Sequence, residues 1–243
     1  MRIAAWMLIL AALVLVLGMG CGKARAPISE PISGPMPQAQ PPASPAAQPE
    51  PGGAQPTPGE KQADLAGLKV AIVIAPSGFR DEEFLEPNKA LKDAGAEVTV
   101  VSLNKGECKG AVSATAEATA TPDEINPDDY AAVVFVGGPG MYKHLDNKKF
   151  VDLAKRFGEK KDKVLAAICV SPAILANAGL LKGVKATAWS DVRPVLAAKG
   201  AEVIEDEPVV VSGRFITASG PEAASAYARA IVAALAAKKA EQK

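Results

Sequence analysis

The segment 163-KVLAAICVSPAILANAG-179 decides how this chain folds. A run of apolar residues ends at Cys169, and a helical pattern marked by Pro172 begins directly after it. A continuous apolar run of this length is typical of a strand buried on both faces of a parallel sheet. Cys169 is therefore either a small apolar residue that closes a buried strand or a nucleophile held at a sharp strand-to-helix turn.

Strand and helix patterns alternate over the whole stretch from 65 to 239. Apolar runs predict buried strands at 69–75, 97–103, 131–138 and 163–168. Shorter strands are predicted at 185–189, 208–213 and 214–218, the last two as a hairpin, and helices at 146–159, 171–178 and 221–239. This alternation predicts an α/β fold, a doubly wound, mostly parallel sheet with helices on both faces.

Two local features qualify this pattern. The helical pattern that follows 76-PSGFR-80 contains Pro87, which should kink or restart the helix, and ends at Gly95, a C-terminal cap. The passage from 104 to 130 is polar and rich in Thr and Ala, and it places Cys108 in a polar loop.

Ligands of such sheets bind beyond the carboxyl ends of the strands. The loop 76–83, the pair Gly137-Gly138 and Cys169 all lie at these ends, so they can converge in one crevice. A helix N-terminus favours a thiolate, and a strand-to-helix turn points its side chain out of the sheet. These arguments predict a lowered pKa for Cys169, although spacing alone leaves an inert buried cysteine as an alternative.

The N-terminal residues 1–20 have the pattern of an export signal. Arg2 precedes the apolar run 3-IAAWMLILAALVLVL-17, which is short for a membrane span, and small residues lead to Cys21. This resembles a bacterial lipoprotein signal, in which the cysteine is lipidated, although Gly18 replaces the usual branched residue. An uncleaved anchor and plain secretion are the alternatives. We expect a protein of the bacterial cell envelope, tethered to a membrane through Cys21.

Residues 21–64 are predicted to be a disordered spacer. Eleven of the twenty prolines lie between 27 and 62, with no apolar periodicity, so this part cannot bury enough surface to offset its ordering entropy. A proline-rich docking ligand is the alternative. The predicted domain covers 65–239, and 240–243 form a C-terminal tail.

Composition excludes several classes of protein. Lysine plus arginine equals aspartate plus glutamate, at 27 each, and aromatic residues make up 5% of the chain, which argues against nucleic-acid binding. One histidine and scattered cysteines give no metal-ligand pattern, and we predict neither a metal nor a cofactor.

The segments "KVAIVIAPSGFRDEEFLEP", "VVFVGGPG", "VLAAICVSPAILANAGLLKG" and "ITASGP", in this order, resemble the DJ-1/PfpI family of the class I glutamine amidotransferase-like fold. The resemblance covers nearly all of 68–239. It implies that Cys169 is the reactive cysteine, that Glu83 is its acidic partner, and that the backbone N–H groups of Gly138 and Val170 face the reactive centre as oxyanion donors. Dimers are common in this family, so a homodimer is one expectation.

The chain also departs from the family pattern. Relatives often carry histidine directly after the cysteine, where Val170 stands here, and at the position of Trp189. The single histidine, His144, is not expected to reach the thiol, so no Cys-His dyad can be assembled. A disulfide between Cys108 and Cys169 remains open.

Two polar residues near the site have structural interpretations. Ser171 is expected to be a helix cap rather than a nucleophile. Asp191 is expected to be an acid in the first turn of a later helix.

These observations leave three functions. The first is chemistry on small electrophiles such as reactive carbonyls, as in glyoxalases and deglycases, or oxidative-stress protection, through a Cys169–Glu83 centre. The second is a redox sensor that turns nothing over, and the third is a binding lipoprotein that has lost catalysis. The missing histidine leaves enzyme status open and makes a cysteine peptidase the weakest interpretation.

Overall fold

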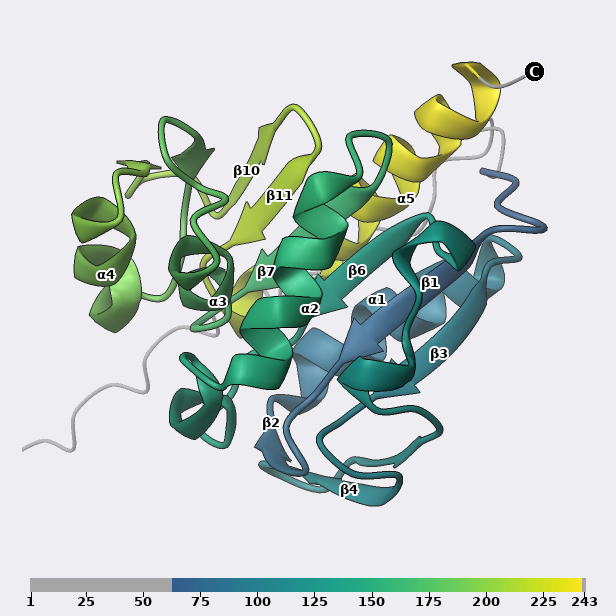
Figure 1. Cartoon of the computed structure of the whole chain (residues 1–243). Helices are drawn as coiled ribbons and strands as arrows, with labels where there is room; N and C mark the ends of the chain where they lie inside the picture. The colour runs from purple at the N-terminus through teal and green to yellow at the C-terminus, as the bar shows by residue number, and fades with distance from the viewer. Residues whose placement is uncertain (1–62, 242–243) are drawn as a thin grey trace, which may run out of the picture. The chain divides into compact units, whose positions relative to one another are not determined.

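The computed structural model describes residues 63–241, so Cys21, the export pattern and nearly all of the predicted spacer lie outside the described residues. Six strands form the main sheet, in the order β10-β11-β7-β6-β1-β3 (Figure 1). Their bounds are β1 Lys69–Val73, β3 Glu97–Val101, β6 Ala132–Phe135, β7 Val164–Ile168, β10 Val209–Ser212 and β11 Phe215–Ala218. All pair in parallel except β10, which runs antiparallel to β11 as the predicted hairpin.

Helices cover both faces of this sheet. The bounds of the helices are α1 Asp81–Asp93, α2 Lys148–Glu159, α3 Pro172–Asn177, α4 Arg193–Ala198 and α5 Ala224–Glu241. Helices α1 and α5 pack against each other on one face, and α2 packs against α3 on the other (Figure 1). The doubly wound, mostly parallel α/β sheet predicted from the alternating pattern is confirmed.

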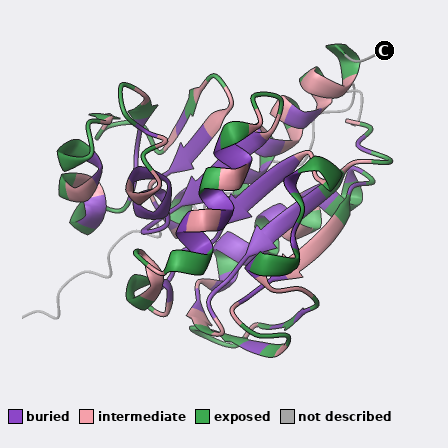
Figure 2. Ribbon diagram, viewed as in Figure 1, coloured by how far each residue is buried: buried purple, intermediate pink, exposed green. Residues whose placement is uncertain are grey.

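The core lies between the sheet and its two helix layers. The strands β6 and β7 are buried at every residue, and β1 at every residue after Lys69, as Figure 2 shows along the centre of the sheet. Strands covered on both faces have no solvent-facing side chains, which is why their sequences are continuous apolar runs instead of alternating ones.

The passage from 104 to 130 differs from the prediction. It contains β4 (Gly106–Gly110) and β5 (Thr115–Ala118), which form a small sheet with β2 (Ser77–Phe79). Cys108 lies in β4 and is 2% exposed, so its assignment to a polar loop was wrong. The pattern was missed because only alternate residues of these short strands are buried. A further short pair, β8 (Lys185–Ala186) and β9 (Glu202–Val203), lies near α4.

Helix α1 also differs from the prediction. It runs without interruption through Pro87, so the expected restart was wrong. Proline at this position lacks the N–H that would bond to the carbonyl of Glu83, and the helix continues despite that loss. The helix ends as predicted, with Gly95 at a φ of 89° and its N–H bonded to the carbonyl of Lys92.

Within residues 63–241, no helix is both long and apolar enough to cross a membrane.

Candidate active site

Cys169 occupies the turn between β7 and α3 in a strained conformation. Its φ of 63° makes it the single non-glycine residue with a positive φ in the described part of the chain. This region costs residues with a Cβ about 1–2 kcal/mol, so tertiary contacts must hold it. The N–H of Cys169 donates to the carbonyl of Ala218 at 2.9 Å, and its carbonyl accepts from the N–H of Trp189 at 2.8 Å. The backbone is therefore fixed as in a nucleophile elbow.

Glu83 reaches the same place from the first turn of α1. The side chain is fully buried, and its Oε2 accepts the backbone N–H of Gly137 at 2.9 Å. Oε1 makes no hydrogen bond of normal geometry in the described residues, although the Cys169 thiol is near enough to affect the pKa of the carboxyl. The structure thus brings together the two residues paired by the sequence.

The glycine pair after β6 makes this approach possible. A Cβ at Gly137 would lie 2.6 Å from the Cβ of Cys169 and 2.8 Å from Oε2 of Glu83. At Gly138, where φ is 105°, a Cβ would lie 2.4 Å from the backbone nitrogen of Arg80. Any larger residue at either position would push the two reactive side chains or the loop before α1 away.

The backbone N–H groups of Gly138 and Val170 point to the reactive centre. Each of these N–H groups lowers the pKa of the Cys169 thiol, as a donor close to the sulfur does. Donors that stabilise a negative sulfur are equally suited to an oxygen that becomes negative when the sulfur attacks a carbonyl.

The buried carboxyl and thiol change each other's ionisation. Burial raises the pKa of Glu83 to about 7, although the thiol of Cys169 and the N–H of Gly137 both act to lower it. Burial, followed by the charge of Glu83, raises the pKa of Cys169 to about 12. The pair therefore loses its first proton near neutral pH and resists losing the second, since that would place two anions side by side.

The sequence-based expectation of a lowered thiol pKa is therefore wrong. Helix α3 is only six residues long, and Cys169 is 8% exposed. The stabilisation of a thiolate by this short helix and by two N–H groups is smaller than the cost of burying the charge next to a carboxylate. Near neutral pH the dominant form is a thiol beside a carboxylate, which can take the thiol proton during attack.

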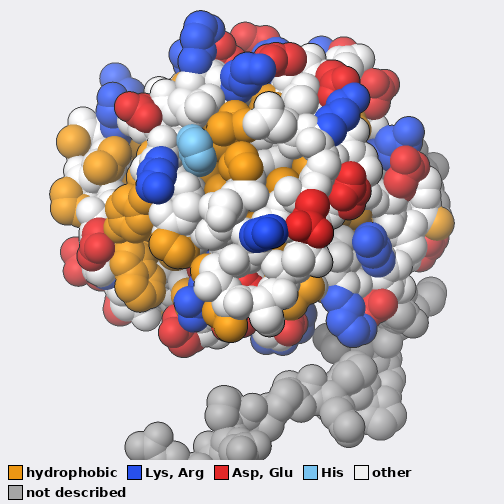
Figure 3. Space-filling model, turned by 90° about the horizontal axis from the view of Figure 1, so that it is seen from below, with side chains coloured by type: hydrophobic (Ala, Val, Ile, Leu, Met, Phe, Trp, Pro, Cys, Tyr) orange, Lys and Arg blue, Asp and Glu red, His pale blue; other side chains and the backbone are white. Residues whose placement is uncertain are grey.

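A cavity of about 320 Å³ opens over the sulfur. Besides Cys169 and Glu83, it is lined by Arg80, Gly138, Pro139, Tyr142, Val170, Trp189, Pro221 and Glu222. Figure 3 shows the domain from below, the side toward which the parallel strands of Figure 1 point, and hydrophobic side chains gather there among scattered charges. The cavity is large enough for a small organic molecule.

The structure places the single histidine, His144, away from the Cys169 cavity, as the sequence predicts. His144 does not line the cavity, and its ring packs edge-on against Phe150 at 6.0 Å between centroids. Trp189 lies in the cavity wall, with its ring close to the backbone of Gly220. The described residues therefore hold no imidazole beside the thiol.

One polar neighbour of the site, Ser171, has a different role from the predicted one. Ser171 does not cap α3, because its hydroxyl donates to the carbonyl of Val136 at 2.8 Å and ties the elbow to the end of β6. Asp191 lies in the first turn of a 3-10 helix, Ser190–Val192, and accepts the Tyr142 hydroxyl at 3.1 Å. Cys108 and Cys169 are both free thiols, so the structure contains no disulfide between them.

Sequence reasoning missed two contributors. Asp81 is 6% exposed and accepts the backbone N–H groups of Val112, Ser113 and Ala114, which fixes the β4–β5 turn beside α1. Burial opposes ionisation of Asp81, but these N–H groups outweigh it and lower its pKa. The N–H of Gly137 was missed as the partner of Glu83. Neither contact has a sequence signal, since the donors are backbone groups far away in the chain.

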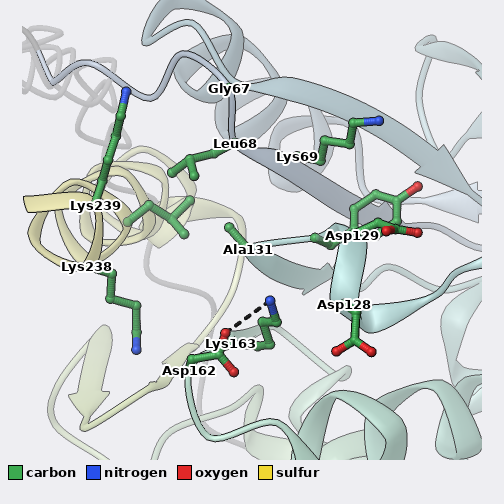
Figure 4. Close-up of a pocket in the computed structure, with 12 residues that line it drawn as sticks. Gly67, Leu68, Lys69, Asp128, Asp129, Ala131, Asp162, Lys163, Lys238 and Lys239 are labelled. Carbon is green, nitrogen blue, oxygen red and sulfur yellow. Dashed lines mark ion pairs between the residues drawn. The ribbon is translucent and has the colours of Figure 1, made fainter. Parts of the chain in front are cut away.

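A second hollow lies at the opposite edge of the sheet, where β1, β6 and β7 begin (Figure 4). Its volume is about 160 Å³, and lysines and aspartates surround it. Lys163 pairs with Asp162 at 3.0 Å, and Lys239 with Asp64 at 3.0 Å. None of its lining residues is a cysteine or histidine. Over residues 63–241, no group of three or more acidic, cysteine or histidine side chains is arranged to hold a metal ion.

Comparison with known proteins agrees with this geometry. General stress protein 18 of Bacillus subtilis is 36% identical over 70% of this chain and 98% of its own length. The protein named Deglycase PfpI of Pyrococcus furiosus is 35% identical over 66% of this chain and 96% of its own. The crystal structure of a ThiJ/PfpI domain protein from Brachyspira murdochii superimposes with a TM-score of 0.67 at 31% identity, covering 70% of this chain and 96% of that one.

The family model called DJ-1/PfpI family matches residues 68–234, which contain Glu83, the glycine pair and the cysteine elbow. The chain belongs to the DJ-1/PfpI family.

Proposed function

We propose that the protein acts on small reactive carbonyl compounds through the Cys169 thiol, with Glu83 as its proton acceptor. One observation carries this proposal: a cysteine in a strained turn lies beside a fully buried carboxyl whose pKa is raised to about 7, and both line one cavity. Strain and buried charge both cost stability, and their occurrence together is typical of a reaction centre. The resemblance to a protein named as a deglycase supports the same substrate class.

The first step is addition of the thiol to an aldehyde. The sulfur forms a bond to the carbonyl carbon while the Glu83 carboxylate takes the thiol proton, and the π electrons of the carbonyl move to its oxygen. The N–H groups of Gly138 and Val170 bind this oxygen as its negative charge develops. Glu83 then returns the proton to the oxygen, which yields a hemithioacetal without net oxidation.

With a 2-oxoaldehyde, the same two residues can complete a cycle. Glu83 removes the proton from the former aldehyde carbon and delivers it to the neighbouring carbon, while the hydroxyl proton of the adduct passes to the oxygen of the neighbouring carbonyl. These two proton shifts convert the adduct into a 2-hydroxy thioester on Cys169. Water hydrolyses the thioester, and a 2-hydroxy acid leaves as the thiol is restored. The sum is one aldehyde and one water giving one acid, so no histidine and no external oxidant are required.

The number of lactate molecules formed per protein chain tests this proposal. Methylglyoxal is incubated with the purified chain, and lactate is measured alongside the intact mass of the protein. Many equivalents of lactate per chain, lost on Cys169→Ser and retained on Cys108→Ser, are the expected result. At most one bound adduct, with no lactate, would exclude turnover of this substrate.

A redox-sensing role is the second candidate, because no histidine lines the cavity and the family includes a protein named as a stress protein. Here Cys169 would be oxidised by a peroxide and would turn nothing over. Mild peroxide should then add two oxygen atoms to Cys169 and none to Cys108, while methylglyoxal is left unchanged. A peptidase is the weakest candidate, since the thiol has no imidazole partner to protonate a leaving amine.

We further propose that the chain is tethered to the cell envelope through a lipidated Cys21. The support is the apolar run 3–17 followed by small residues and a cysteine. Labelled fatty acid should enter the wild type and not Cys21→Ser. Equal release of both proteins into the medium would exclude the anchor.

A further inference from the structure

Two buried polar atoms behind the cavity lack a hydrogen-bond partner in the described residues. They are Oε1 of Glu83 and the hydroxyl of Tyr227, and both residues are 0% exposed. Folded proteins rarely leave buried oxygens unpaired, because each gives up its water contacts on folding. Each of these two atoms therefore requires a partner.

The two residues lie on two helices that pack against each other. Glu83 lies in the first turn of α1 and Tyr227 in the first turn of α5, and these helices pack against each other on the same face of the sheet. After burial, the charge of Glu83 is the influence that raises the pKa of Tyr227. The phenol and the carboxyl are thus close enough to interact through the protein interior.

We propose that one bridging water accepts a hydrogen bond from the Tyr227 hydroxyl and donates one to Oε1 of Glu83, and so holds the carboxyl against the Cys169 sulfur. An ionised carboxylate can only accept, so it needs a donor on this side, and a water oriented by the phenol hydroxyl supplies one. Oε2 is already fixed by the N–H of Gly137, so the second bond would lock the carboxyl at both oxygens. Tyr227 does not line the cavity, so it is a positioning residue and not a catalytic one.

This inference rests on the proposed function, in which Glu83 takes the thiol proton. The groups that act on the Glu83 pKa, besides its own burial, are Cys169, the N–H of Gly137, Arg80 and Glu82. Tyr227 adds a donor from the α5 side. A donor stabilises the ionised carboxylate, so its removal must raise the pKa of Glu83 further above its usual range.

The variant Tyr227→Phe removes only the hydroxyl. Tyr130→Phe is the matched control, because the Tyr130 hydroxyl bonds to Thr99 at 3.3 Å and does not line the Cys169 cavity. The rate of Cys169 alkylation by iodoacetamide is measured from pH 5 to 9 by peptide mass, a readout that needs no turnover. We expect the midpoint to rise by about 0.5–1 pH unit in Tyr227→Phe and to stay in place in Tyr130→Phe.

Thermal melting provides the second measurement. If the hydroxyl is linked to Glu83 through this water, Tyr227→Phe should lower the melting temperature in the wild-type background and change it less in a Glu83→Gln background. An unchanged alkylation midpoint together with a higher melting temperature would overturn the inference, since it would mean that the hydroxyl was buried without a partner. A wild type with no step near neutral pH would instead overturn the carboxyl–thiol pair and the proposed function with it.

Discussion

The two hollows of the domain lie at opposite ends of the parallel strands, and they are lined by different kinds of residue. The hollow at the amino ends is surrounded by lysines and aspartates that pair at the surface, as between Lys163 and Asp162. The cavity at the carboxyl ends has a fully buried carboxyl and a cysteine with a φ of 63°. Exposed ion pairs contribute at most about 1 kcal/mol, whereas buried charge and backbone strain each cost several times the thermal energy.

Of the two hollows, only the cavity at the carboxyl ends contains groups that cost the fold stability. A concave surface forms wherever strand ends and loops leave a gap, and it requires no special residues. A buried acid with a pKa of about 7 and a strained cysteine destabilise the fold, so a protein retains them where they contribute to function. Matched substitutions at the two ends of the strands should therefore have different effects on activity and stability.

The largest contrast is expected in turnover. If the protein converts methylglyoxal, Cys169→Ser should lower the rate by about 1,000-fold or more, because loss of a nucleophile removes the covalent route. Lys163→Ala, at the amino-end hollow, should change it less than about twofold, since a surface ion pair contributes little. Comparable losses in both variants would show that the two edges are not functionally distinct.

The next contrast concerns two glycines with positive φ. Gly138→Ala should destabilise the domain by about 2–5 kcal/mol, because its Cβ would lie 2.4 Å from the backbone nitrogen of Arg80 and φ is 105°. Gly67→Ala, at the amino-end hollow, has a φ of 83° but meets nothing within 4 Å, so only the backbone strain of about 1 kcal/mol is expected. Chemical denaturation measures both, and equal losses would contradict the close packing at the glycine pair.

A smaller contrast is expected in the pH dependence of stability. The pKa of Glu83 is raised from 4.5 to about 7, so wild-type stability should be complete below pH 4.5 and fall as pH rises through 7. Glu83→Gln cannot ionise and should therefore be more stable than the wild type by about 2–3 kcal/mol at pH 8, with the gain vanishing near pH 4.

The control at the amino-end hollow, Asp162→Asn, should change stability in the opposite direction. The Lys163 ammonium lowers the pKa of Asp162, so this carboxyl contributes stability above its unfolded pKa and loses it on acidification. Asp162→Asn should therefore destabilise slightly near neutral pH, with the difference disappearing in acid. Melting temperatures from pH 2 to 8 measure both variants. A Glu83→Gln protein less stable than the wild type at pH 8 would contradict the buried, ionising carboxyl.

Much of the fold was predictable because its central strands are covered on both faces. Burial on both faces demands continuous apolar runs, and the runs at β1, β6 and β7 were visible as such. The short strands β4 and β5 were not, because only their alternate residues face inward. Cys108 was consequently assigned to a loop, although it is buried.

The sequence was enough to place the site residues in one crevice, but it was not enough to predict the directions of their pKa shifts. Topology brings the ends of β1, β6 and β7 together, so Cys169, the glycine pair and Glu83 could be placed in one crevice. The degree of burial of Glu83 has no sequence signal within the acidic run 81–83, and it decides the direction in which both pKa values move. The contribution of Tyr227 depends on the packing of α5 against α1, which the sequence does not encode locally.

The pH dependence of Cys169 alkylation in the wild type and in Glu83→Gln shows whether the carboxyl and the thiol ionise as a coupled pair. Loss of the first proton of the pair creates the reactive state, so the wild-type rate should rise with a midpoint near pH 7 and level off above it. In Glu83→Gln this step should disappear, and the rate should rise only in alkaline solution as the thiol itself ionises. The same profile in both proteins, or a Cys169 that reacts only after the domain has unfolded, would contradict the coupled carboxyl–thiol pair.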